Sequence, residues 1–253
     1  MYKIQKRRDI NKQIDINSIK RQLLDFHPDI LRTSLLNSLV KYIKKYIKKI
    51  NGKKVLFIGG GIGREIIKLK EYESFFAVNL DINFQLLRIG SNYYKINKIQ
   101  CYCILGDGMQ LPFKDNVFDI VILYESLHHM DDLVLCLKES FRVAKIVCIV
   151  DRRKCFISKL AKSLGLIQPE IDGFANELDI KWFKNWLKNN LNLYEVIIKY
   201  HFLYLLVINK KIHNFFVKIP ICYIVKIFVQ MVNIFFGYLG NGVVIAVKKI
   251  KQN

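Results

Sequence analysis

The chain lacks the cysteine spacings that zinc sites and disulfide frameworks require. Its six cysteines, at positions 101, 103, 136, 148, 155 and 222, include no CxxC pair, and no histidine stands at metal-ligand spacing. We therefore expect no metal site, and we predict reduced, mostly buried thiols in a cytoplasmic protein. The first residues, MYKIQKRRDINKQ, are basic but have no apolar run behind them, so we expect no signal peptide.

Acidic residues are few. The 21 Asp and Glu face 41 Lys and Arg, which gives a formal net charge of +20. Such an excess would suit nucleic acid, an anionic lipid surface or an acidic substrate. The basic residues are nevertheless spread from end to end among Ile and Asn, so a drift in composition explains them about as well as a binding face does.

Helical and strand-like patterns alternate along the chain. Residues 29–50 carry apolar side chains at helical spacing, which predicts an N-terminal helical extension over 1–50 and a main domain over 51–253. Alternation of strands and helices predicts βαβ units, hence a parallel sheet with helices on both faces. The first five strands are expected at 53–58, 74–81, 99–107, 118–126 and 145–151.

Glycine is scarce too, with 13 in 253 residues, yet four of them fall within positions 59–63 of the stretch VLFIGGGIGRE. This turn follows the first strand, where a parallel sheet normally binds its main ligand. A Walker A loop would end in Gly-Lys-Ser/Thr, and a dinucleotide fingerprint would need a glycine where Arg64 stands. The spacing that fits is GxGxG, at Gly59, Gly61 and Gly63.

With this turn and the string GDGMQLPFKDNVFDIVILYESLHHM at 106–130, the sequence resembles the class I S-adenosylmethionine-dependent methyltransferases, in the branch of quinone-biosynthesis and small-molecule enzymes. The resemblance implies a Rossmann-like, doubly wound α/β fold, whose seven-stranded, mostly parallel sheet ends in an antiparallel hairpin. It also implies S-adenosyl-L-methionine as cofactor. Asp81 would hold the ribose hydroxyls and Asp107 the adenine amino group. The implied cofactor-binding set is Gly59, Gly61, Gly63, Asp81, Ile82, Asp107, Gly108, Met109, Leu123 and Tyr124.

Methyl transfer from a sulfonium is an in-line displacement, and much of its rate comes from holding acceptor and methyl group in line. A base is needed only when the acceptor is a hydroxyl or an activated carbon. His128 is the candidate base, because it follows the fourth strand and has a suitable unperturbed pKa. Tyr124 and Glu125 are weaker candidates.

The last two strands are expected at 193–208 and 242–250, with a hydrophobic helical insertion at 209–240 between them. Gly237, Gly240 and Gly242 interrupt the apolar run, which argues against a transmembrane helix. The insertion is expected either to pack on the sheet or a subunit, or to form a lid or a peripheral membrane contact. The stretch YESL, in place of an Asp/Asn-Pro-Pro-Tyr/Phe string, argues against nucleic acid as the acceptor.

These patterns favour methyl transfer to a small-molecule or lipid-like acceptor. The alternative is a non-catalytic, membrane-peripheral protein on the same fold. It stays open because Phe57 occupies a position where the family often has an acidic residue.

Overall fold

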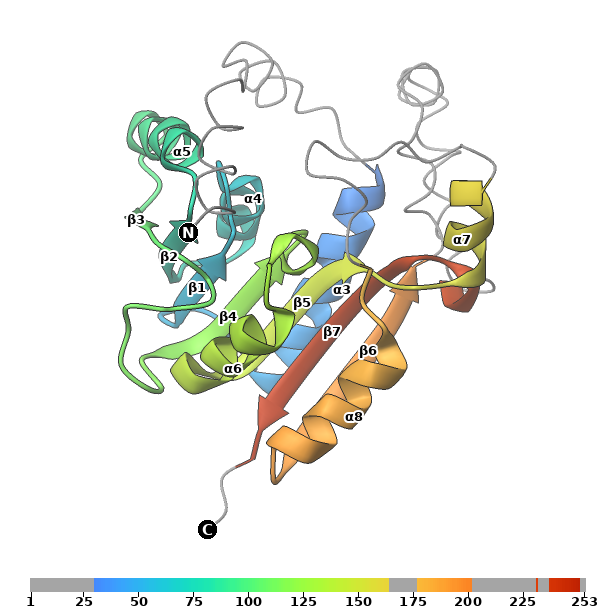
Figure 1. Cartoon of the computed structure of the whole chain (residues 1–253). Coiled ribbons are helices and arrows are strands. Elements are labelled where there is room, and N and C mark those ends of the chain that lie inside the picture. The colour runs from blue at the N-terminus through green and yellow to red at the C-terminus, as the bar shows by residue number, and fades with distance from the viewer. Residues whose placement is uncertain (1–29, 164–176, 202–230, 232–236, 251–253) are drawn as a thin grey trace.

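A computed structural model describes residues 30–163, 177–201, 231 and 237–250. Seven strands form one sheet in the order β3-β2-β1-β4-β5-β7-β6 (Figure 1). Their bounds are β1 Lys54–Ile58, β2 Phe76–Asp81, β3 Cys101–Leu105, β4 Phe118–Tyr124, β5 Ala144–Arg152, β6 Tyr194–His201 and β7 Gly242–Lys249. The first five strands are parallel, and β7 runs antiparallel to both β5 and β6. The sequence-based expectation of a Rossmann-like sheet with an antiparallel final hairpin is confirmed.

Helices cover both faces of the sheet (Figure 1). One face packs against α6 (Leu133–Val143) and α8 (Ile180–Asn190), and the other against α3 (Ile30–Tyr46), α4 (Arg64–Tyr72) and α5 (Phe84–Ile96). The central strands β1, β4, β5 and β7 are buried on both faces, which explains why they read as unbroken Val, Ile and Leu runs. The remaining described helices are η2 (Leu127–His129), α7 (Phe156–Ser163) and η4 (Gly237–Leu239).

Side-chain caps fix where several helices begin. The Asn83 side chain accepts hydrogen bonds from two amides at the start of α5, and Asp132 and Asp179 cap α6 and α8 in the same manner. Asp81 lies two residues before the Asn83 cap, at the end of β2 and thus at the carboxyl edge of the sheet.

Two strands end earlier than the sequence pattern indicates. β3 stops at Leu105. β4 stops at Tyr124, because Glu125 adopts a left-handed backbone with φ of 49°. β6 is described from Tyr194 to His201; residues 202–208 and most of the insertion expected at 209–240 lie outside the described residues. No helix in the described part of the chain has the length and apolar character that crossing a membrane needs.

Candidate cofactor and acceptor site

The glycine turn lies between β1 and α4, at the carboxyl edge of the sheet. Gly59, Gly61 and Gly63 have φ values of 66°, 53° and 75°, a region that residues with a side chain rarely adopt. Gly63 is the N-cap of α4 and makes no side-chain cap hydrogen bond. The Gly59 and Gly60 amides donate to the Leu80 carbonyl, and the Gly61 amide donates to Asp81, so the turn is fastened to the carboxyl end of β2.

Two buried side chains, Asn79 and Tyr94, hold the backbone of this turn, and we call this pair the bracket. The sequence pattern does not identify them. The Asn79 amide donates to the Gly61 carbonyl at 3.0 Å, and the Tyr94 hydroxyl donates to the Ile62 carbonyl at 3.2 Å. A side chain on Gly63 would overlap the Tyr94 hydroxyl. The bracket thus requires glycine at this position for reasons of space as well as of backbone angle.

Asp81 ends β2 beside the turn and is 8% exposed. Its Oδ2 accepts a hydrogen bond from Gly61 N at 2.7 Å, and its Oδ1 accepts one from Asn83 N at 2.8 Å. Burial raises the pKa of the Asp81 carboxyl, while the bonds from these amides act in the opposite direction. Each carboxylate oxygen can accept a further hydrogen bond, so the geometry fits a ligand with two adjacent hydroxyls.

The turn after β3 holds Asp107, Gly108 and Met109. Asp107 Oδ1 accepts from Met109 N at 2.8 Å, which closes a local turn. A side chain on Gly108 would come within 2.5 Å of Ile58 and 3.2 Å of Met130. The turn is therefore pressed against the end of β1, next to the glycine turn.

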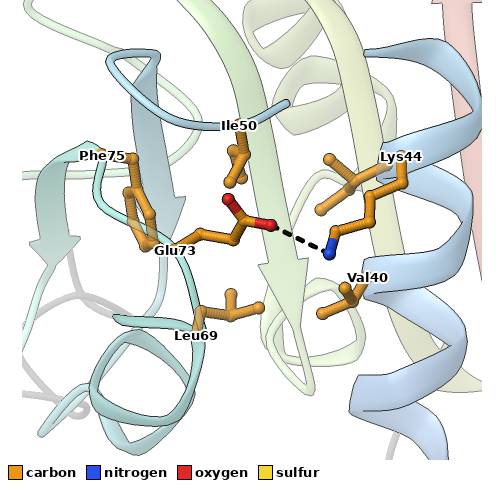
Figure 2. Close-up of a pocket in the computed structure, with 7 residues that line it drawn as sticks. Val40, Lys44, Ile50, Leu69, Glu73 and Phe75 are labelled. Carbon is orange, nitrogen blue, oxygen red and sulfur yellow. Dashed lines mark ion pairs between the residues drawn. The ribbon is translucent and has the colours of Figure 1, made fainter. Parts of the chain in front are cut away.

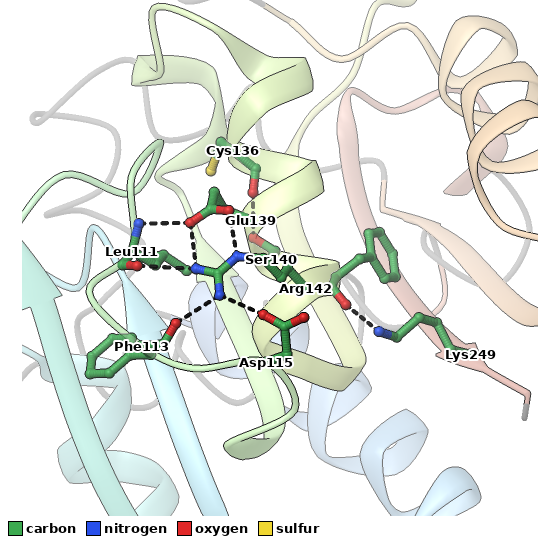
Figure 3. A network of polar contacts seen from close by, with 9 residues as sticks. Leu111, Phe113, Asp115, Cys136, Glu139, Ser140, Arg142 and Lys249 are labelled. Atoms are coloured by element: carbon green, nitrogen blue, oxygen red, sulfur yellow. Dashed lines mark hydrogen bonds and ion pairs between the residues drawn. The ribbon is translucent and has the colours of Figure 1, made fainter.

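Arg142 locks the rest of the 106–118 segment onto α6 (Figure 3). Its guanidinium donates to Glu139 through two bonds of 2.7 Å, to Asp115 at 2.8 Å, and to the Phe113 and Leu111 carbonyls at 2.7 and 3.1 Å. Glu139 in turn accepts from Leu111 N at 2.8 Å. The spacing of residues in the LPFKDNVFD string thus has a structural reason, because two of its backbone carbonyls and the Asp115 carboxylate all accept hydrogen bonds from the same guanidinium, that of Arg142.

The end of β4 lies beside the glycine turn, because β1 and β4 are paired in parallel register. Leu123 is fully buried in the core, so only its backbone can face a ligand, and Tyr124 is 8% exposed. Ser126 packs directly against Gly59, where an added side chain would come within 2.6 Å of its Cβ. Its buried hydroxyl has no hydrogen-bond partner among the described residues, which is the mark of a position that a ligand completes.

His128 and Asp151 meet at the neighbouring strand end. The His128 Nδ1 lies 2.5 Å from Asp151 Oδ1, and both side chains are buried. The same carboxylate accepts from the backbone N of His128 at 3.2 Å and of Arg152 at 2.7 Å. The His129 ring lies beside that of His128, with ring centroids 4.0 Å apart and the ring planes tilted by 45°. Asp151 was not among the expected site residues, because nothing in its local sequence indicates a partner 23 positions away.

A hollow elsewhere in the molecule does not belong to this site (Figure 2). It lies between α3 and the connection from α4 to β2, and an ion pair of 2.9 Å between Lys44 and Glu73 crosses it. Its apolar lining includes Ile50 and Phe75, which precede β1 and β2. The hollow is therefore at the amino ends of the strands, opposite to the glycine turn.

Residues 56–147 match the family model described as "Methyltransferase domain". Over this segment the chain is similar to that methyltransferase family. The matched residues include the glycine turn, Asp81, the 106–118 segment and His128, and they end just before Asp151.

Curated methyltransferases are similar over the same region. Cycloartenol-C-24-methyltransferase 1 of Oryza sativa subsp. japonica is 32% identical over 96 residues, which are 37% of this chain and 28% of the relative. Demethylmenaquinone methyltransferase of Corynebacterium glutamicum (strain R) is 35% identical over 94 residues, or 37% of this chain and 38% of the relative. The chain thus spans about a third of the length of the curated relatives it matches.

Solved structures share the fold over most of this chain. The putative sarcosine dimethylglycine methyltransferase of Galdieria sulphuraria superposes with a TM-score of 0.60 at 15% identity, covering 87% of this chain and 86% of that one. The YcgJ protein of Bacillus subtilis gives a TM-score of 0.58 at 15% identity, covering 85% of this chain and 100% of the other. These likenesses extend the fold assignment beyond the matched segment to β6 and β7.

Proposed function

We propose that this protein transfers a methyl group from S-adenosylmethionine to a small-molecule acceptor, with His128 as the base. The observation that carries the base assignment is the 2.5 Å contact between His128 Nδ1 and Asp151 Oδ1, next to the glycine turn. When bound, S-adenosylmethionine supplies a methyl group on a positively charged sulfur. Gly59, Gly61 and Gly63, with Asp81 and Asp107, would hold it, in agreement with the turn geometry and the unpaired Ser126 hydroxyl.

The tautomer of His128 follows from its partner. Because the Asp151 carboxylate accepts three N–H groups, Nδ1 of His128 donates to it and Nε2 carries the lone pair. His128 Nε2 then takes the proton from an acceptor O–H or C–H. The acceptor atom would keep the electron pair of that bond and use it to bind the methyl group that S-adenosylmethionine would supply, with the thioether sulfur as the leaving group. Asp151 stabilises the imidazolium that results.

We further propose that the methyl acceptor is lipid-like. The relatives are named for cycloartenol and demethylmenaquinone, both small lipid-like molecules, and the apolar segment expected at 209–240 would suit such a substrate. The test is methyl transfer from radiolabelled S-adenosylmethionine into an apolar and a polar metabolite extract. Label that appears only in polar products contradicts the lipid-like acceptor and leaves the methyl transfer itself standing.

The base assignment is tested with His128→Gln and Asp151→Asn. Each should lower turnover by about 10²–10⁴, while calorimetry shows unchanged affinity for S-adenosylhomocysteine. His129→Gln is the matched control, because its ring lies beside that of His128, whereas the bond to Asp151 is made by His128. Small effects on turnover in both test variants would mean that positioning alone carries the reaction. Failure of the wild-type protein to bind S-adenosylhomocysteine would refute the whole proposal in favour of the non-catalytic alternative.

A further inference from the structure

Beyond Asp151, the chain continues along the carboxyl edge into Arg153, which pairs with the residue before β7. Arg153 N donates to the Asn241 carbonyl at 2.7 Å, two positions past the antiparallel pair of Asp151 and Val243. Side chains two residues apart on a strand lie on the same face, so Arg153 and Asn241 continue the face that carries Asp151. The Arg153 guanidinium lies 4.2 Å over the ring of Tyr200, the β6 partner of Val243, in agreement with this placement.

The order of the strands places these residues relative to the proposed reaction. The glycine turn follows β1, His128 meets Asp151 at the end of β5, and Asn241 precedes β7, the strand next to β5. Arg153 and Asn241 therefore lie on the far side of His128 from the glycine turn. An acceptor with its reacting atom at His128 would extend its other end toward them.

Both residues keep a buried polar atom without a partner. Asn241 is 4% exposed, and neither its Oδ1 nor the Nε of Arg153 forms a hydrogen bond within the described residues. Buried polar groups are nearly always paired in native proteins, so a missing bond calls for an explanation. A ligand that supplies the bond is such an explanation, because the two atoms belong to side chains of residues paired with each other across the sheet, beside the proposed base.

The charge at this place favours an anion. Arg153 supplies the positive charge, and its guanidinium is oriented by the Tyr200 ring and by a hydrogen bond to the Tyr238 carbonyl. Within the part of the chain that the structure describes, no hydrogen bond fixes the Asn241 side-chain amide, so a half-turn about χ2 can bring its NH₂ group into the place of Oδ1. A guanidinium beside an amide then offers two donors to a pair of anionic oxygens.

We propose that Arg153 and Asn241 bind a carboxylate or phosphate group that the methyl acceptor carries at the end remote from the methylated atom. The role of this group in the reaction rests on the proposed function, whereas the anion site itself does not. The site would select, among small acceptors, those with an acidic end, and an apolar body of the acceptor is compatible with it.

The anion site is tested by NMR on ¹⁵N-labelled protein saturated with S-adenosylhomocysteine. Acetate and inorganic phosphate are titrated separately at constant ionic strength, and the Arg153 Nε–H and Asn241 NH₂ resonances are followed. We expect saturable shifts of both. Binding should weaken at least fivefold in Arg153→Gln, followed at Asn241, and in Asn241→Ala, followed at Arg153. Arg88→Gln removes an equal charge from an exposed position on α5 and should leave binding unchanged.

Loss of the Tyr200 contact could prevent Arg153→Gln from folding. Asn241→Ala retains that contact, so it still tests the anion site in that case. A response to acetate alone indicates a carboxylate in the acceptor, and a response to phosphate alone indicates a phosphate ester. If neither anion moves the two resonances, or if Asn241→Ala binds as the wild type does, the anion site is refuted. If S-adenosylhomocysteine does not bind, the proposed function fails, and the same titration without it decides the anion site by itself.

Discussion

The Asp81 carboxylate accepts hydrogen bonds from two backbone amides of its own chain even without a ligand. It therefore has a structural role in addition to any role in ligand binding. Its two oxygens accept from Gly61 at 2.7 Å and from Asn83 at 2.8 Å, so the carboxylate ties the glycine turn to the start of α5. A ribose would add hydrogen bonds to the same oxygens. Asp81 is thus expected to act on the cofactor both directly and through the turn.

The first prediction separates these two contributions. Asp81→Asn should weaken the binding of S-adenosylhomocysteine by roughly 1.5–3 kcal/mol, the range for hydrogen bonds to a charged group. The analogue that lacks the ribose 2′-hydroxyl should lose less when Asp81 is changed, since part of the direct bonding is already absent. Calorimetry with both ligands measures the difference. An equal loss for the two ligands would mean that Asp81 acts through the turn alone.

The pH dependence of binding at this site follows from the same residue. Burial raises the pKa of Asp81 above the ordinary value of 3.8, so the carboxyl takes up its proton at a higher pH than an exposed aspartate would. The protonated form accepts fewer hydrogen bonds. Affinity for S-adenosylhomocysteine should therefore fall on acidification while the pH is still above that ordinary value, and Asp81→Asn should remove this part of the dependence.

At the scale of elements, the glycine turn shows why one glycine differs from another. Gly52 and Gly63 have nearly the same φ, 73° and 75°, but Gly52 has open space around it, whereas Gly63 sits against Tyr94. Any side chain pays for the left-handed backbone at both positions, by about 1–2 kcal/mol. Only at Gly63 does a side chain also collide with a neighbouring helix.

Gly52→Ala and Gly63→Ala therefore form a matched pair. We expect Gly52→Ala to lower the free energy of unfolding by about 1–2 kcal/mol and Gly63→Ala to lower it by about 1–3 kcal/mol more, as overpacking does. Urea denaturation measures both. Tyr94→Phe, combined with Gly63→Ala, should recover part of the excess, because the hydroxyl is the atom nearest to the added methyl group. Equal losses of unfolding free energy in Gly52→Ala and Gly63→Ala would mean that Tyr94 moves aside for the added methyl group.

The sequence predicts an element well when the signal for it lies among neighbouring residues, and poorly when it depends on contacts between distant segments. Hydrophobic periodicity and the glycine spacing predict β1 to β5 in their order, since each signal lies within one element or one turn. The resemblance adds the antiparallel pair, but the register that brings Asp151 to His128 is a property of the assembled sheet. Asn79 likewise reads as an ordinary polar residue in a strand until α5 brings Tyr94 over it.

At the scale of the whole molecule, α3 is part of the core rather than an appendage to it. Leu35, Leu36, Leu39 and Ile43 are buried in one cluster with Ile122, Val150 and Val244, residues of three sheet strands. The Tyr46 hydroxyl also donates to the Ala246 carbonyl in β7 at 3.3 Å. Without α3, one face of β4, β5 and β7 would be exposed, so the sheet that supports the candidate site depends on a helix from outside the matched 56–147 segment.

The last prediction tests this dependence with Leu39, whose side chain is 0% exposed on the sheet-facing side of α3. Leu39→Ala should lower the free energy of unfolding by about 2–5 kcal/mol, because the cavity it leaves lies against a rigid sheet. The exposed neighbour Asn37 serves as control, and Asn37→Ala should change the stability by less than about 0.5 kcal/mol. Denaturation followed both by far-UV circular dichroism and by S-adenosylhomocysteine binding should give one shared transition, shifted in Leu39→Ala. If binding survives after α3 has melted in a separate, earlier transition, then the helix is a dispensable extension and the site stands on the remaining sheet alone.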